Sequence, residues 1–125
     1  MRLDALGIIV SDMEASLAFY RRLGLDIPVD ADSEGHVEVA VGGIRLMFDT
    51  VEMVRSFTEW DPPVGGHGIG LAFLCDSPTQ VDDSFAGLIH AGYRAASEPF
   101  DAFWGQRYAT VLDPDGNPVD LFAPL

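Results

Sequence analysis

The chain has few positively charged residues, and this limits the kinds of partner that it can bind. Its 125 residues include 7 Lys plus Arg against 20 Asp plus Glu, which gives a formal net charge of −13. Because phosphate attraction needs clustered basic side chains, this balance argues against a nucleic-acid partner. The excess of acid favours cations instead, although an acidic surface that only keeps the domain soluble accounts for the same balance.

Cysteine and long apolar runs are also scarce. The single cysteine, Cys75, excludes an intrachain disulfide, and its place in an apolar run predicts a small buried thiol. No apolar run approaches the roughly 20 residues that span a bilayer, and the first residues lack the layout of a signal peptide. We therefore expect a cytoplasmic protein with no membrane partner. The share of hydrophobic residues, 48%, is that of an ordinary globular domain.

The first half of the chain predicts a strand, a helix and a hairpin. An apolar run over 3–10 is followed by Ser11, which has Glu three residues later, the spacing of a capping box. This spacing and the apolar stripe behind it predict a helix over about 12–23. Alternating apolar and polar residues over 37–48 predict a hairpin that turns at Gly42-Gly43.

The second half repeats this plan. A run over 70–74 predicts a strand, and Ser77 followed by Pro and by Gln three residues later predicts a capped helix that ends at Gly92. Three further strands are predicted over 93–97, 106–112 and 119–122, with a turn over 113–117.

Each half is therefore expected to be a β-α-β-β-β module in an α+β protein. We expect one domain over 1–125, with one module over about 1–50, a linker over about 51–67 that starts with a short helix, and a second module over about 68–125. In each module the helix would cover one face of a small sheet, leaving the other face to curve around a ligand.

Alternation assigns side chains to these two faces. The apolar set expected to face the helices is Val37, Val39, Val41, Ile44, Leu46, Phe48, Ile69, Leu71, Phe73, Val119 and Leu121. The set expected on the opposite face is Glu38, Ala40, Arg45, Met47, Asp49, Gly70, Ala72, Asp120 and Phe122, with Ala5 and Gly7 alongside. Small residues in the second set leave room for a ligand, and a filled face or a subunit interface is the alternative.

Several motifs resemble those of the vicinal oxygen chelate superfamily, the glyoxalase, bleomycin resistance and extradiol dioxygenase group. They are Val10-Ser11-Asp12, Phe19-Tyr20, Leu23-Gly24, Gly70-Leu71-Ala72-Phe73 and Asp113-Pro114-Asp115-Gly116-Asn117-Pro118-Val119-Asp120-Leu121. The resemblance covers nearly the whole chain, with both repeats in order. It implies tandem βαβββ modules that form an open, curved, barrel-like sheet, commonly completed in a homodimer.

The resemblance also implies where a metal would bind in metal-using members. Those members place ligands at positions that correspond here to Ala5, Met47, Gly70 and Asp120. Only Asp120 keeps a carboxylate, whereas a divalent ion needs about three protein ligands. We therefore expect no metal ligands and no cofactor. A regrouped site of His36, His67 and Asp120 is the alternative, and it requires their loops to converge.

The segment over 100–108 is rich in large amphipathic side chains and resembles a segment near the pocket mouth of non-metal relatives. Trp104 would supply a flat wall, and the Arg107 guanidinium could hold a carboxylate or carbonyl. The alternative is that Trp104 plugs the barrel end and Arg107 pairs with an acid such as Asp120. Strand parity leaves open whether Arg107 or Tyr108 points inward.

The function predicted from these features is the binding of a small organic molecule, cationic or aromatic, in a concave groove, with sequestration of an antibiotic or metabolite as its purpose. The candidate ligand-binding residues are Glu38, Arg45, Met47, Asp49, Trp104, Arg107, Tyr108, Asp120 and Phe122. The alternative is a lyase, isomerase, hydrolase or dioxygenase that uses Asp120 or Glu38 as a general base with a pKa raised by burial, or that uses the regrouped metal site.

Overall fold

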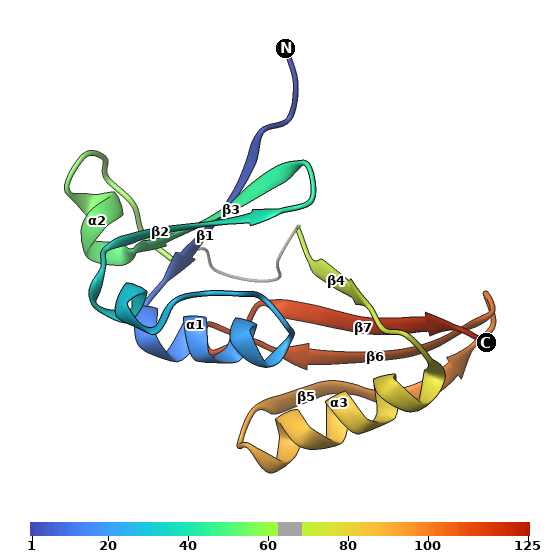
Figure 1. Cartoon of the computed structure of the whole chain (residues 1–125). Helices are drawn as coiled ribbons and strands as arrows, with labels where there is room; N and C mark the ends of the chain where they lie inside the picture. Colours follow the sequence, from blue (N-terminus) through green and yellow to red (C-terminus); the bar gives the residue numbers. More distant parts are fainter. Residues whose placement is uncertain (63–68) are drawn as a thin grey trace. The chain divides into compact units, whose positions relative to one another are not determined.

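A computed structural model describes residues 1–62 and 69–125 of the chain. The chain divides into two compact units, Met1–Val64 and Gly65–Leu125, and each has its own open sheet (Figure 1). The α+β class and the two sheets agree with the predicted fold class.

The first unit has a three-stranded sheet in the order β1-β3-β2. Strand β1 runs parallel to β3, and β2 runs antiparallel to it. The elements in chain order are β1 (Ala5–Val10), α1 (Met13–Arg22), the 3-10 helix η1 (Val29–Ser33), β2 (His36–Val41), β3 (Ile44–Thr50) and α2 (Val51–Arg55). Helix α2 confirms the short helix predicted at the start of the segment between the two modules.

Aromatic side chains form the core of the first unit. Tyr20, Phe19 and Phe48 are fully buried, and the Tyr20 ring centroid lies 5.0 Å from that of Phe19 and 5.2 Å from that of Phe48. Edge-to-face and tilted ring pairs at such distances add to the stabilisation from burial. These contacts hold α1 against β3 on one face of the sheet.

Helix α1 begins one residue later than the capping-box pattern predicts. Asp12 is the cap: its backbone is extended, and its carboxylate accepts a hydrogen bond from the Ala15 amide at 3.0 Å. With the cap at Asp12, Glu14 occupies the second helical position and cannot complete the box predicted from Ser11.

The first unit has three strands, not the four predicted for each module. Among its described residues, the chain between α1 and β2 forms only η1. The segment contains Pro28, which lacks an amide donor, and the carboxylates Asp26, Asp30 and Asp32, a residue type that is depleted in strands. Arg21 fixes this segment by donating to the Ile27 carbonyl at 2.7 Å and to the Asp32 carboxylate at 2.8 Å.

The second unit is the β-α-β-β-β module that its sequence predicts. Its sheet has the order β4-β7-β6-β5, with β4 parallel to β7 and the other pairs antiparallel. The elements are β4 (Leu71–Leu74), α3 (Pro78–His90), β5 (Arg94–Ala102), β6 (Gln106–Leu112) and β7 (Pro118–Pro124).

Helix α3 packs on one face of β5, β6 and β7 through the buried side chains of Val81, Phe85 and Leu88 (Figure 1). The predicted Ser77 cap is confirmed, because its hydroxyl accepts from the Gln80 amide at 3.1 Å. Cys75, between β4 and α3, is a buried thiol as predicted, and burial raises its pKa. Its amide donates to the Phe122 carbonyl at 2.7 Å.

Strand register supports the predicted division into two faces, with one exception. The inward set includes Val37, Leu46, Val119 and Leu121, all of which are buried. Ile69 was expected to be inward but is 70% exposed, because β4 begins only at Leu71 and Ile69 lies before the paired part of the strand. No helix in the described part of the chain has the length and apolar character needed to cross a membrane.

Candidate functional site

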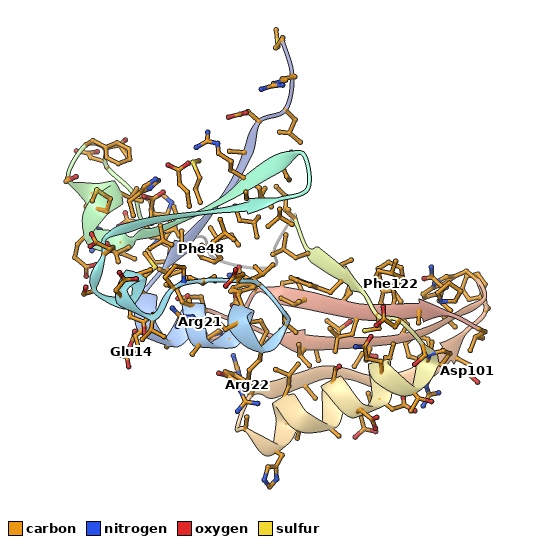
Figure 2. All side chains as sticks on the ribbon, in the orientation of Figure 1. Glu14, Arg21, Arg22, Phe48, Asp101 and Phe122 are labelled. Atoms are coloured by element: carbon orange, nitrogen blue, oxygen red, sulfur yellow. The ribbon has the colours of Figure 1, made fainter. Side chains whose placement is uncertain are left out.

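The helix-free face of the second sheet gathers polar and aromatic side chains from three strands. Thr110 pairs with Asp120, and Tyr108 pairs with Phe122, across β6 and β7. Because side chains alternate along a strand, these residues share one face. Phe122 is labelled on β7 in Figure 2. The register therefore answers the open question of parity: Tyr108, and not Arg107, shares the face of Asp120.

Asp120 is held by two hydroxyl groups. Tyr108 Oη donates to Asp120 Oδ2 at 2.6 Å, and Thr110 Oγ1 donates to Asp120 Oδ1 at 2.6 Å. The bond to Asp120, with a smaller effect of burial, raises the pKa of Tyr108 to about 12. Each carboxylate oxygen has a second lone pair, so Asp120 keeps acceptor capacity for a ligand.

Five aromatic rings in mutual contact, one of which bonds to this carboxylate, define what we call the aromatic face: Phe100, Phe103, Trp104, Tyr108 and Phe122. The Trp104 ring lies 5.4 Å from that of Tyr108 and 6.1 Å from that of Phe100. Trp104 Nε1 donates to Gln106 Oε1 at 2.9 Å, which fixes the indole in place. Trp104 is 49% exposed and Phe103 is 98% exposed, so solvent reaches the rings.

Arg107 lies on the other face of the same sheet. Its Nε donates to Asp82 of α3 at 2.9 Å, and its Nη1 donates to Asp101 of β5 at 3.1 Å. These bonds, that to Asp82 above all, raise the pKa of Arg107. One of the two predictions for Arg107 was an ion pair with an acid such as Asp120. Arg107 does pair with acids, but these are Asp82 and Asp101. Its guanidinium ties α3 to the sheet, and this placement does not suit the ligand contact predicted for it.

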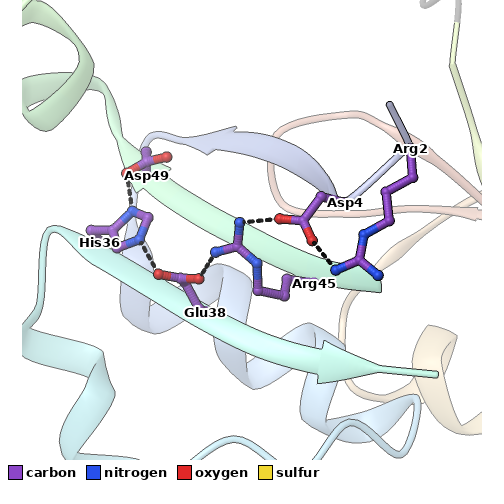
Figure 3. Close-up of polar contacts among 6 residues, drawn as sticks. All are labelled: Arg2, Asp4, His36, Glu38, Arg45 and Asp49. Atoms are coloured by element: carbon purple, nitrogen blue, oxygen red, sulfur yellow. Dashed lines mark hydrogen bonds and ion pairs between the residues drawn. The ribbon is translucent and has the colours of Figure 1, made fainter. Parts of the chain in front are cut away.

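The face of the first sheet opposite to α1 carries a row of charges of alternating sign, which we call the charged ladder (Figure 3). It runs through Asp49, His36, Glu38, Arg45, Asp4 and Arg2. His36 Nδ1 lies 2.6 Å from Asp49 Oδ1, and His36 Nε2 lies 3.1 Å from Glu38 Oε2. Arg45 bonds to the second oxygen of Glu38 and donates to Asp4 Oδ2 at 2.6 Å.

The ladder shifts the proton affinities of its members. The hydrogen bonds to Asp49 and Glu38 raise the pKa of His36. The hydrogen bonds from His36 and Arg45 lower the pKa of Glu38. This corrects the prediction that burial would raise the pKa of a general base at Glu38, because the side chain is exposed and is flanked by two cationic groups.

The pairing of His36 with Asp49 was not predicted, although the sequence contained the signal. A two-residue turn at Gly42-Gly43 joins residue 41 to residue 44, so counting outward places His36 opposite Asp49. Asp49 and Glu38 were assigned to this face, but His36 was considered only as a ligand of the regrouped metal site. Thr110 was also missed, because its pairing with Asp120 depends on the length of the turn over 113–117.

The residues at the family's metal positions do not fit a divalent ion. Ala5 and Gly70 have no donor atom, and Met47 offers only a thioether. Asp120 alone offers a carboxylate at these four positions, and a divalent ion needs about three protein ligands. Within residues 1–62 and 69–125, no cluster of three or more His, Cys, Asp and Glu side chains could hold a metal ion. His67, named in the regrouped site, lies outside the described residues.

Comparison with known proteins agrees with this fold. The sequence model of the Glyoxalase/Bleomycin resistance protein/Dioxygenase superfamily matches residues 2–121. The chain belongs to this superfamily. The resemblance seen in the sequence motifs is thereby confirmed, at the level of the superfamily. A search of curated proteins finds no match for this glyoxalase-superfamily chain.

Several solved structures resemble this chain over nearly its whole length. A glyoxalase/bleomycin resistance protein/dioxygenase family enzyme from Burkholderia phytofirmans is 23% identical, covers 100% of both chains and has a TM-score of 0.81. A glyoxalase-related enzyme from Fulvimarina pelagi is 21% identical over 98% of this chain and 87% of that chain, with a TM-score of 0.81. A protein from Agrobacterium tumefaciens is 28% identical over 100% of this chain and 98% of that chain, with a TM-score of 0.74.

Proposed function

We propose that this superfamily member binds a small organic molecule with an aromatic, positively charged part on the aromatic face of its second sheet. The observation that carries the proposal is the partly exposed cluster of rings that is joined to the Asp120 carboxylate through Tyr108. Flat rings supply contact area with few rotatable bonds, and the carboxylate supplies a fixed point for a donor. An antibiotic or metabolite of this kind would be held without the help of a cofactor.

The charge of the expected ligand follows from the partners of Asp120. In the described part of the chain, its carboxylate accepts from Tyr108 and Thr110 and forms no ion pair with Arg or His. Hydroxyl groups orient a carboxylate but do not neutralise it. A ligand ammonium would supply the missing positive charge, and stacking on Trp104 or Phe122 would add a cation–π term of roughly 0.5 to 2 kcal/mol.

Calorimetric titration with matched basic, neutral and acidic aromatic compounds tests the proposal. The basic compounds should bind, added salt should weaken their binding, and a chelator should leave it unchanged. Asp120→Asn should weaken their binding about 5- to 30-fold, the equivalent of roughly 1 to 2 kcal/mol, and Trp104→Ala should weaken it similarly. The control Asp83→Asn removes an equal charge from an exposed site on α3.

Two results would overturn the proposal. One is binding of the acidic compounds only, which would show that the acidic surface merely keeps the protein in solution. The other is equal affinity of the parent protein, Asp120→Asn and Trp104→Ala for every compound that binds. A Trp60→Phe background leaves Trp104 as the sole tryptophan, because the chain has 2 Trp residues, so its fluorescence then reports contact at the aromatic face.

A further inference from the structure

We propose that the segment after α2 forms a binding site for a free α-amino acid with a large apolar side chain. Arg55 would hold the carboxylate of this ligand, Asp61 its ammonium and Trp60 its side chain. The site lies within the first unit and shares no residue with the aromatic face or the charged ladder. It stands on a cavity, on the hydrogen bonds that shape this cavity and on the charges that line it.

The cavity is formed by a short stretch of chain over 55–61. Its volume is about 340 Å³, and its lining residues are Arg55, Thr58, Glu59, Trp60 and Asp61. Ligand pockets in proteins have volumes of roughly 300 to 1,000 Å³, so this one is at the small end of the range. The volume therefore suits a small metabolite of about the size of an amino acid.

Local hydrogen bonds hold the walls of the cavity in place. Helix α2 follows β3 at one end of the first sheet, and its Val54 side chain is buried (Figure 1). The Val54 carbonyl accepts from the Thr58 amide at 3.1 Å, which continues the helical turns beyond Arg55. Arg55 Nε then donates to the Trp60 carbonyl at 3.2 Å and folds the chain back towards the helix. The fold thus forms the cavity without a ligand.

Arg55 presents unused donors to an anion. Among the described residues, Nε is the only atom of this guanidinium that makes a hydrogen bond, because Nη2 lies 3.7 Å from Asp61 Oδ1. The Arg55 side chain is 53% exposed, so a small molecule can reach it. The remaining N–H groups form a planar fork that matches the two oxygens of a carboxylate. The expected ligand therefore carries a carboxylate.

Asp61 sets a negative charge next to this guanidinium. The ammonium and the carboxylate of an α-amino acid are attached to one carbon, so their partners in a site must also be neighbours. The contact between Arg55 and Asp61 is long and exposed, and such ion pairs are weak. A zwitterion can therefore separate the two side chains and bind to both. Glu59 adds a second carboxylate to the lining, which favours a ligand that also carries a positive charge.

Trp60 supplies the surface for the side chain of the ligand. The residue is half-buried, which restrains it, and it lines the cavity beside the charged groups. An indole offers a large flat apolar area with few rotatable bonds. A large apolar side chain gains from this contact, whereas glycine gains nothing from it. We therefore expect leucine and phenylalanine to bind more tightly than glycine.

Tryptophan fluorescence in a Trp104→Phe background tests the proposal, because the chain has 2 Trp residues and Trp60 then reports alone. The probes are leucine, 3-methylbutylamine, which lacks the carboxylate of leucine, and 4-methylpentanoate, which lacks its ammonium. Leucine should produce a saturable change in emission. Each analogue should bind about 10-fold more weakly or worse, because it leaves one charged side chain without its partner, and glycine should also bind about 10-fold more weakly.

Two charge-removing variants assign the two ends of the ligand. Arg55→Gln and Asp61→Asn should each weaken leucine binding about 10-fold or more. Arg55→Gln should leave the affinity for the amine unchanged, and Asp61→Asn should leave that for the acid unchanged, which a general loss of structure would not produce. The control Arg22→Gln removes an equal charge from an exposed position of α1.

Arg55→Lys separates the charge of Arg55 from its bond to the Trp60 carbonyl. Lysine and glutamine both lose this bond, but lysine keeps the positive charge, so Arg55→Lys should bind leucine more tightly than Arg55→Gln. The proposal is overturned if neither leucine nor phenylalanine changes the Trp60 emission, or if leucine and its two analogues bind equally well. Leucine affinity that is the same in the Trp104→Phe parent, Arg55→Gln and Asp61→Asn would also overturn it.

Discussion

Asp120 accepts from two hydroxyl groups on a sheet face where water also reaches. A hydrogen bond from a phenol to a carboxylate favours the neutral phenol, since ionisation would break the bond and place two negative charges side by side. The same contact therefore holds the carboxylate in position and keeps Tyr108 a donor. A ligand that meets Asp120 meets an anion whose orientation is already fixed.

The Tyr108 contact predicts an unusual alkaline titration. One of the chain's 3 Tyr residues should ionise with a pKa of about 12, well above the usual value of about 10. Because the folded-state pKa is the higher one, the stabilisation is fully present below pH 10 and is lost as the pH rises through about 12.

Tyrosinate absorbance measured against pH checks this. Asp120→Asn should bring the late step down towards the usual value of about 10. Tyr108→Phe should remove that step and leave the rest of the curve unchanged. If the parent protein shows no late step, the Tyr108 hydroxyl does not bond to Asp120 in solution.

His36 predicts a second pH effect, with its sign set by the raised pKa. The ion pairs of His36 contribute fully below the usual histidine pKa of about 6.5, and the contribution declines as the pH rises through the higher folded-state pKa. The side chain is 39% exposed, so the loss should be small, no more than about 1 kcal/mol. Urea unfolding across this range should show the decline in the parent protein and a flatter curve in Asp49→Asn. An equal slope in both would mean that the pair does not stabilise the fold.

At the scale of the elements, capping residues predict the two long helices to within about a residue, because a cap bond is local. For α3 the donor and the acceptor lie three residues apart, and Pro78 at the first helical position fixes the start. The same logic misplaced the start of α1, since Ser11 and Asp12 are both good caps. Only the extended backbone of Asp12 shows which one closes the first turn.

The Ser77 cap carries a measurable part of the stability of α3. Ser77→Ala leaves the Gln80 amide without its acceptor and should lower the free energy of unfolding by about 1 kcal/mol. The matched control is Thr79→Ala, which alters an exposed residue of the same turn that makes no cap bond. The two variants are compared by urea unfolding with circular dichroism. Equal losses in both would show that helix propensity, and not the cap, sets the effect.

Strands were predictable where pairing follows from a short turn and unpredictable where it does not. The Gly42-Gly43 turn fixes the register of β2 and β3, and with it the His36–Asp49 pair. The turn over 113–117 does not fix the register of β6 and β7 in this way. Only the structure shows on which face of the sheet Tyr108 lies. The prediction of a fourth strand in the first unit was wrong for another reason. It rested on the repeat of the second half, but Pro28 and the neighbouring aspartates make the segment between α1 and β2 unsuited to a strand.

At the scale of the molecule, the open edges of the two sheets bear on assembly. We propose that the chain forms a homodimer. Strands β1 and β2 end the first sheet, and β4 and β5 end the second, so each sheet has edges that another chain can cover. With a net charge of −13, copies of the chain repel one another, and salt screens that repulsion.

Light scattering after size-exclusion chromatography should give twice the mass of one chain at tens of micromolar protein, and added salt should lower the concentration at which the dimer dissociates. The salt dependence separates charge repulsion from a change in fold, which circular dichroism monitors in parallel. A mass of one chain at every salt concentration would contradict the dimer while leaving the fold unaffected.

Chemical labelling of Cys75 can report transient opening of the second sheet. The thiol lies buried beside the edge strand β4, and its amide is bonded to the Phe122 carbonyl of β7. A thiol reagent can reach it only when that junction comes apart, and since the chain has 1 Cys, every modified molecule records one event at one known place. The labelling rate, compared with the rate in denaturant, therefore measures how often the edge of the sheet detaches while the rest of the chain stays folded.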